Sequence, residues 1–176
     1  NGACVGDQSL VLLMHLNENS GATSFFDSSG NNNNGKCSGS SCPKAGVTTQ
    51  RGGAAKFDGL NDFINISHSS SLNIKDAITI SVWVKPERLR DYADIVSKDD
   101  RYILQWQRNT LKPRFTFKIP GNNTWRSVSS PEAIDGRTYH HVVGVYDKNG
   151  GANNMKLYVD GVLKAQGTYT NAIEST

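Results

Sequence analysis

The chain has 176 residues, and we expect a single domain over residues 1–176 with an N-terminal extension at residues 1–9. Its 19 Lys and Arg residues against 16 Asp and Glu residues give a formal net charge of +3, which is too small to indicate a nucleic-acid-binding protein. No apolar run approaches the roughly 20 residues that cross a bilayer, so we expect no membrane insertion by this segment. Because the sequence begins at Asn1 rather than at a methionine, we expect a mature or excised segment whose targeting signal lies upstream.

The N-terminal part favours one strand followed by irregular chain. Residues 10–16 are a continuous apolar run of strand length, which predicts a strand covered on both faces. Residues 17–46 are rich in Asn, Ser and Gly, which suit loops. Short strands are expected at residues 54–57 and 62–66, and residues 69–73 form at most a turn of helix.

Three cysteines lie in the first quarter of the chain. Cys37 and Cys42 bracket Ser-Gly-Ser-Ser, a loop flexible enough to close into a small disulfide ring, and neither has the companions that a zinc site requires. Cys4 can instead pair with either of them, because connectivity does not follow from sequence alone. We favour a disulfide and an oxidising compartment over free buried thiols.

The central part predicts a series of strands. Apolar side chains alternate with polar ones and with Trp83 over residues 78–85, which predicts a long strand with one apolar side that ends at Pro86. Further strands separated by polar turns are predicted at residues 94–98, 102–106, 114–118 and 125–129.

The C-terminal part has the clearest turn chemistry. A strand covered on much of both faces is predicted at residues 139–147, followed by a turn and a strand at 155–159. Asp160 and Gly161 then favour a two-residue type I′ turn into a strand at residues 162–167. About eleven strands and no helix longer than a turn predict an all-β, antiparallel sandwich, because closing two sheets on each other buries so many apolar faces.

Several segments, in chain order, resemble the signatures of the laminin-G-like, concanavalin A-like jelly-roll domains. They include the loop that begins with Asp27-Ser-Ser-Gly-Asn and residues 57–63, 80–86, 95–98, 139–147 and 155–161. The resemblance implies a two-sheet jelly roll. Its functional implication is broader, since the superfamily includes sugar binders, adhesion modules, pentraxins and inert spacers.

The sequence departs from the family pattern at its end. Domains of this family usually finish with another pair of strands, the last of which pairs beside the first strand. We therefore expect that the chain is a fragment of a longer polypeptide, or that a neighbouring molecule donates the missing strand. An open sheet edge beside residues 10–16 then makes a homo-oligomer possible.

Catalytic residues are not expected. Glycosidases that share this fold use a pair of carboxylates on one strand, and no such cluster lies on a predicted strand. His140 and His141 are adjacent in the sequence, so they point to opposite faces and cannot form one base–nucleophile pair. We place His141 partly under the sheet and His140 on the surface.

Calcium (Ca²⁺) is the expected cofactor, because turns rich in Asp, Asn and carbonyl groups supply the oxygen ligands it needs. The candidate ligands are Asp27 in the loop at residues 27–34, and Asp58 and Asp62 in the turn at residues 58–62. Asp99 and Asp100 resemble, by their position after residues 95–98, the calcium ligands of pentraxins. The alternative is that these turns cap their own backbone without an ion.

Exposed aromatic rings with polar neighbours would bind sugar. The candidates are Tyr92, Tyr102, Trp106 and Trp125, with Arg108 nearby, although Trp106 and Trp125 can instead belong to the core. We therefore predict a non-catalytic recognition or adhesion module, secreted or on the cell surface, that binds glycan or an extracellular protein. The alternatives are a structural subunit of a surface filament or cell-wall assembly completed by strand sharing, and an accessory domain of a secreted glycoside hydrolase.

Overall fold

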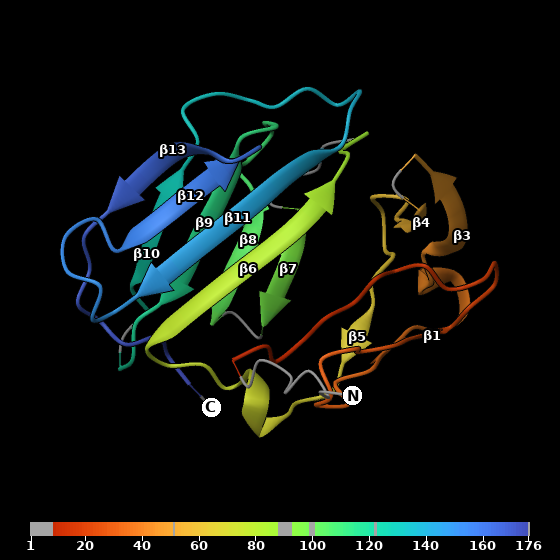
Figure 1. Cartoon of the computed structure of the whole chain (residues 1–176), viewed down its shortest axis with the longest axis horizontal. Coiled ribbons are helices and arrows are strands. Elements are labelled where there is room, and N and C mark those ends of the chain that lie inside the picture. Colours follow the sequence, from red (N-terminus) through yellow and green to blue (C-terminus); the bar gives the residue numbers. More distant parts are fainter. Residues whose placement is uncertain (1–8, 51, 88–92, 99–100, 122, 176) are drawn as a thin grey trace, which may run out of the picture. The chain divides into compact units, whose positions relative to one another are not determined.

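The computed structural model (Figure 1) describes residues 9–50, 52–87, 93–98, 101–121 and 123–175. The chain divides into two compact units, residues 1–73 and residues 74–176. The single-domain organisation expected from the sequence stays a prediction. The described residues are all-β with antiparallel strands, and none of them forms a helix that is long and apolar enough to cross a membrane.

The first unit contains short strands. A three-stranded antiparallel sheet has the order β1-β2-β5, and a separate hairpin pairs β3 with β4. Two short 3₁₀ turns occur at Gly39–Ser41 and Ser70–Leu72. The strands are β1 (Ser24–Phe25), β2 (Gly35–Lys36), β3 (Lys44–Thr49), β4 (Gly52–Lys56) and β5 (Asn65–Ile66). Part of the region expected to be irregular therefore forms β1, β2 and the start of β3.

The strand predicted at residues 10–16 is wrong. The structure gives this segment only an isolated bridge between Met14 and Asp27. Leu10 is 39% exposed, and Leu16 has a φ of 54°, in the left-handed region that interrupts an extended strand. The apolar run is thus a loop held by its backbone.

The disulfide between Cys37 and Cys42 is confirmed, with the two Cα atoms 5.0 Å apart. It closes a short ring in the segment between β2 and β3. Main-chain bonds anchor both ends of this ring, since Cys37 N donates to Thr23 O and Phe63 N donates to Ser41 O. Cys4 lies outside the described residues.

The second unit is a sandwich of two four-stranded antiparallel sheets, which confirms the predicted jelly-roll fold class (Figure 1). The β11 sheet has the order β13-β12-β11-β6, and the β9 sheet has the order β10-β9-β8-β7. The first comprises β6 (Ala77–Val84), β11 (His140–Asp147), β12 (Met155–Val159) and β13 (Val162–Gly167). The second comprises β7 (Asp94–Lys98), β8 (Tyr102–Trp106), β9 (Pro113–Lys118) and β10 (Trp125–Ser129).

The core lies between the two sheets of this unit. Phe117 of the β9 sheet meets Tyr146 of the β11 sheet with the ring centroids 4.3 Å apart. The Tyr146 hydroxyl donates to the carbonyl of Asn171, 2.5 Å away, and so ties the C-terminal segment to the core. Burial raises the pKa of Tyr146, and the nearby carboxylates of Asp147 and Asp76 add to the shift, so the hydroxyl stays a donor.

Candidate functional site

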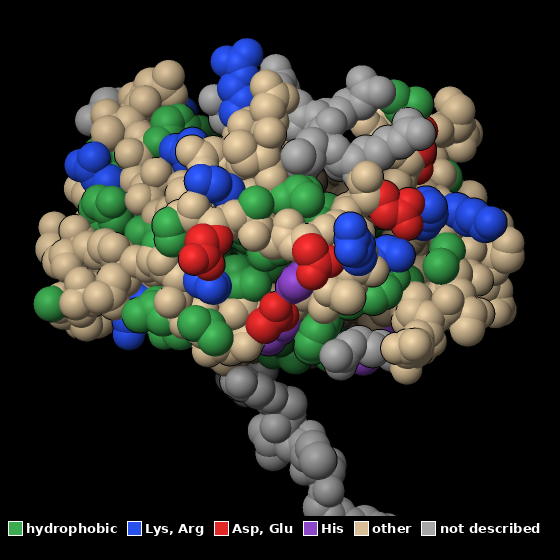
Figure 2. Space-filling model, turned by 90° about the horizontal axis from the view of Figure 1, so that it is seen from above, with side chains coloured by type: hydrophobic (Ala, Val, Ile, Leu, Met, Phe, Trp, Pro, Cys, Tyr) green, Lys and Arg blue, Asp and Glu red, His purple; other side chains and the backbone are tan. Residues whose placement is uncertain are grey.

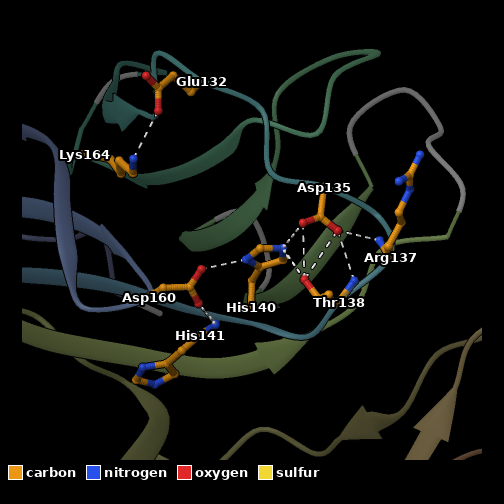
Figure 3. A network of polar contacts seen from close by, with 8 residues as sticks. All are labelled: Glu132, Asp135, Arg137, Thr138, His140, His141, Asp160 and Lys164. Atoms are coloured by element: carbon orange, nitrogen blue, oxygen red, sulfur yellow. Dashed lines mark hydrogen bonds and ion pairs between the residues drawn. The ribbon is translucent and has the colours of Figure 1, made fainter.

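The turn between β12 and β13 brings a carboxylate to the start of β11. Val142 pairs with Val159, so this register places His141 opposite Asp160. Asp160 and Gly161 have φ values of 51° and 79°, as a type I′ turn requires. The Asp160 carboxylate accepts a bond from the His141 main-chain nitrogen at 2.9 Å and lies 2.7 Å from Nδ1 of His140 (Figure 3).

The other ring nitrogen of His140 faces the loop that precedes β11. Nε2 lies 3.2 Å from Oγ1 of Thr138 and 3.5 Å from Oδ2 of Asp135. Asp135 in turn accepts bonds from the main-chain nitrogens of Arg137 and Thr138, at 2.7 and 3.0 Å. The His140 side chain is only 13% exposed, so the expectation of a surface histidine is wrong. Figure 2 shows histidine side chains flanked by acidic ones on this face.

Both carboxylates beside His140 are stabilised in their charged form. Burial opposes the charge of Asp160, but bonds from His140 and from the His141 main chain outweigh it and lower the pKa of Asp160 below its ordinary value. For Asp135, the main-chain nitrogens of Arg137 and Thr138 lower the pKa. Negative charge therefore lies on two sides of one imidazole ring at neutral pH.

Thr138, His140 and Asp160 form a series of hydroxyl, imidazole and carboxylate, an order also used to activate nucleophiles. Here the Thr138 hydroxyl also lies 3.3 and 3.4 Å from the two oxygens of Asp135, which offer it an alternative acceptor. The series joins the loop at residues 135–138, strand β11 and the β12–β13 turn. We call these contacts the clamp around His140, because they hold three segments together at one end of the sandwich.

His141 points to the opposite face from His140, as its position in the sequence predicted (Figure 3). Its Nε2 atom lies 2.8 Å from Oγ of Ser81, and its ring stacks on Trp83 at a centroid distance of 5.0 Å and an interplanar angle of 21°. Trp83 is 47% exposed. We call Trp83, His141 and Ser81 the Trp83 platform.

The Trp83 platform continues across the outer face of the β11 sheet. Ser81 pairs with Val143, Val143 with Tyr158 and Tyr158 with Leu163, so the four side chains form one row. Leu163 is 42% exposed, and Val143 and Tyr158 are half-buried. This face combines an exposed indole with apolar side chains and scattered polar groups.

One family model matches the part of the chain that contains the sandwich and the Trp83 platform. A model described as the concanavalin A-like lectin/glucanases superfamily matches residues 57–176. The chain belongs to this superfamily. Its laminin G-like domains are typically non-catalytic binding modules and often bind carbohydrate or protein. No curated protein and no solved structure matched the chain.

The superfamily match contains the sugar-binding candidates, and the structure buries two of them. Tyr102 and Trp106 are 6% and 5% exposed and pack in the core of the sandwich, so their rings are not available for stacking on a sugar. Trp125 is half-buried on β10, and Arg108 is exposed in the turn after β8. Tyr92 lies outside the described residues. The roles of Trp125 and Arg108 stay predictions.

Among the calcium candidates, Asp27 is surrounded by donors. Oδ1 accepts bonds from the main-chain nitrogens of Leu13 and Ser29, and Oδ2 accepts from the Ser29 hydroxyl and the Asn33 main chain, all at 2.8 to 2.9 Å. Burial opposes the charge, but these bonds lower the pKa of Asp27. A carboxylate offers about four lone-pair sites. The donors therefore leave little room at Asp27 for a cation.

Two of the other calcium candidates, Asp58 and Asp62, lie in one turn. Oδ1 of Asp58 accepts from the main-chain nitrogens of Leu60 and Asn61, and Oδ2 of Asp62 accepts from the Asp58 main chain. Asp99 and Asp100 lie outside the described residues. Within the part of the chain that is described, no three His, Cys, Asp or Glu side chains are grouped to hold a metal ion. Calcium binding stays a prediction.

Sequence reasoning missed the clamp around His140 and the stacking of Trp83 on His141. Part of the signal for the first was available, since the Asp160-Gly161 turn places Asp160 at the end of β12. Its pairing with residue 141 depends on the register of β11 with β12, which a different turn sets. Asp135 carried no comparable signal, because a loop of this kind has no pattern that predicts where it folds back.

Proposed function

We propose that the chain is a non-catalytic recognition module that acts outside the cell and binds carbohydrate through the Trp83 platform. The observation that carries the proposal is the exposed indole of Trp83, held against the parallel ring of His141. An indole offers a flat apolar surface to the C–H face of a pyranose ring. The hydroxyl and imidazole groups beside it offer hydrogen bonds to sugar hydroxyls.

The surroundings of the platform support this use. Trp83 lies on a strand rather than on a loop. The His141 ring stacks on its indole, and Ser81 holds that ring through the contact with Nε2. A side chain that is already held in place loses little conformational entropy when a ligand binds. This low cost matters most for a ligand that binds weakly, such as a sugar. The disulfide between Cys37 and Cys42 supports an oxidising location, secreted or on the cell surface.

A glycan array tests the proposal. We expect the chain to retain at least one class of glycan and Trp83→Ala to weaken that binding at least tenfold, with far-ultraviolet circular dichroism unchanged. Phe26→Ala is the matched control, because Phe26 is an aromatic residue that is 64% exposed in the first unit. Binding that survives Trp83→Ala but is lost in Trp125→Ala would place the site on the β9 sheet instead. A chain that retains no glycan contradicts the proposal.

A further inference from the structure

The chain from Met14 to Asp27 forms a closed loop in the first unit. A backbone bridge pairs Met14 with Asp27 at the base of this loop. Beside the bridge, the main-chain nitrogen of Ser28 donates to the carbonyl of Leu13 at 2.8 Å. A loop whose ends meet in this way is a compact surface element, and loops of this kind frequently carry function.

This loop, together with Ser28, lines a cavity of about 360 Å³. The described residues that line it all lie between positions 15 and 28, on both legs of the loop. The volume is at the lower end of the roughly 300–1,000 Å³ of small-molecule sites, so the cavity suits a small ligand or a single side chain. These residues lie outside the segment that the superfamily model matches, residues 57–176, and none of them belongs to the Trp83 platform.

The β3–β4 hairpin packs closely on one leg of the loop. A Cβ atom on Gly53 would lie 2.6 Å from Cα of Asn17, and one on Gly46 would lie 2.6 Å from the main-chain nitrogen of Ser20. Only residues without a side chain permit so close an approach of two backbones. Part of the cavity wall is therefore held in place before a ligand arrives, which lowers the entropy lost on binding.

Glu18 places a carboxylate in the wall of the cavity. Its Oε1 atom accepts a bond from the main-chain nitrogen of Phe26 at 3.0 Å. Its Oε2 atom is buried, and no described residue donates a hydrogen bond to it. None of the described residues in the lining is a lysine or arginine, and the first such residue in the sequence is Lys36. The negative charge of Glu18 is therefore not balanced by the described groups around it.

An aromatic ring lines the same cavity. Phe25 is fully buried, whereas the next residue, Phe26, is 64% exposed and lies in the cavity lining. The face of such a ring attracts a cation. Further oxygen atoms in the lining come from the side chains of Asn17, Asn19, Ser24 and Ser28.

We propose that this cavity binds a primary alkylammonium group, which belongs either to a small free amine or to a lysine side chain. The Glu18 carboxylate supplies the opposite charge, and the Phe26 ring supplies a cation–π contact. The amide and hydroxyl oxygens accept hydrogen bonds from the ammonium group. A neutral ligand would leave the charge of Glu18 unbalanced, and an anion would be repelled by it. The proposal is independent of carbohydrate binding, because the two sites share no residue.

The first probe is butylammonium, titrated into the ¹⁵N-labelled 176-residue chain and followed by amide NMR. We expect saturable shifts at residues 15–28, and no such shifts with butanol, which has the same carbon chain without the charge. Glu18→Gln keeps an oxygen for the Phe26 main chain and should weaken binding roughly tenfold, because hydrogen bonds to charged groups are the stronger ones. Glu132→Gln makes the same change at a glutamate that pairs with Lys164 in the second unit, and should leave binding unchanged.

Phe26→Ala tests the contribution of the ring. It should weaken butylammonium binding and leave glycan retention intact, whereas Trp83→Ala should leave butylammonium binding intact. A short peptide with one lysine identifies the source of the group: tighter binding than butylammonium assigns a lysine side chain, and weaker binding assigns a free amine. The proposal is overturned if neither probe causes saturable shifts at residues 15–28, if butanol causes the same shifts, or if Glu18→Gln binds butylammonium as tightly as the wild-type chain.

Discussion

The ring of Phe115 in β9 occupies the space in front of Gly144 in β11. A Cβ atom on Gly144 would lie 2.6 Å from Cγ of Phe115, closer than two carbon atoms can approach without a shift of the structure. Phe115 is fully buried, so its ring has nowhere to move without disturbing the core. The absence of a side chain at residue 144 thus sets how closely the two sheets pack.

Gly144→Ala should destabilise the sandwich by about 1–3 kcal/mol, because an added methyl group in a packed core forces neighbouring side chains away from their preferred positions. The free energy of unfolding in urea measures the effect. Phe115→Leu serves as the control, since it removes the obstructing ring. The double variant should lose less stability than the sum of the two single variants, and a simple sum would contradict the contact.

Asp160→Asn tests the clamp around His140. The pKa of Asp160 is lowered in the folded state, so its carboxylate contributes stability above the ordinary aspartate value of about 3.9, and this contribution is lost as the pH falls through the lowered value. We expect the wild-type chain to lose thermal stability over this acidic window and Asp160→Asn to depend less on pH there. Asparagine tolerates the positive φ of this position, so the turn itself should remain.

The control for this prediction is Asp147→Asn, which alters another turn carboxylate, one that caps the main chain of Asn149. It should keep the acid dependence that Asp160 causes. Identical pH profiles for the wild-type chain and Asp160→Asn would show that the contact with His140 contributes nothing to stability.

The strands of the sandwich were predictable, and the reason is their pattern. Residues 94–98, 102–106, 125–129, 155–159 and 162–167 were predicted with the bounds that the structure has. Residues 155–159 alternate between buried and half-buried side chains. Polar turns bound each of the five segments, and their length and apolar content suit strands.

The failures occurred where contacts between distant residues decide the structure. Residues 10–16 have the composition of a buried strand, yet their backbone is used by the side chains of Asp27, Asn31 and Asn33. Tyr102 and Trp106 offered rings of the right kind for sugar binding, but strand β8 is buried along its whole length. Composition identifies such residues, whereas exposure depends on what packs against them.

Asp27 and Asp58 give a comparison that separates the two calcium candidates. Asp27→Asn replaces one carboxylate oxygen with an amide nitrogen, which cannot accept the hydrogen bonds that this oxygen receives. We expect it to destabilise the first unit by about 1–3 kcal/mol whether or not calcium is present. If calcium binds at the other turn, it should raise the melting temperature of the wild-type chain, and Asp58→Asn should abolish that increase while Asp27→Asn keeps it. Thermal unfolding with calcium and with a chelator measures both effects, and magnesium serves as the control ion. An increase that disappears in Asp27→Asn but persists in Asp58→Asn would mean that the ion displaces the donors around Asp27.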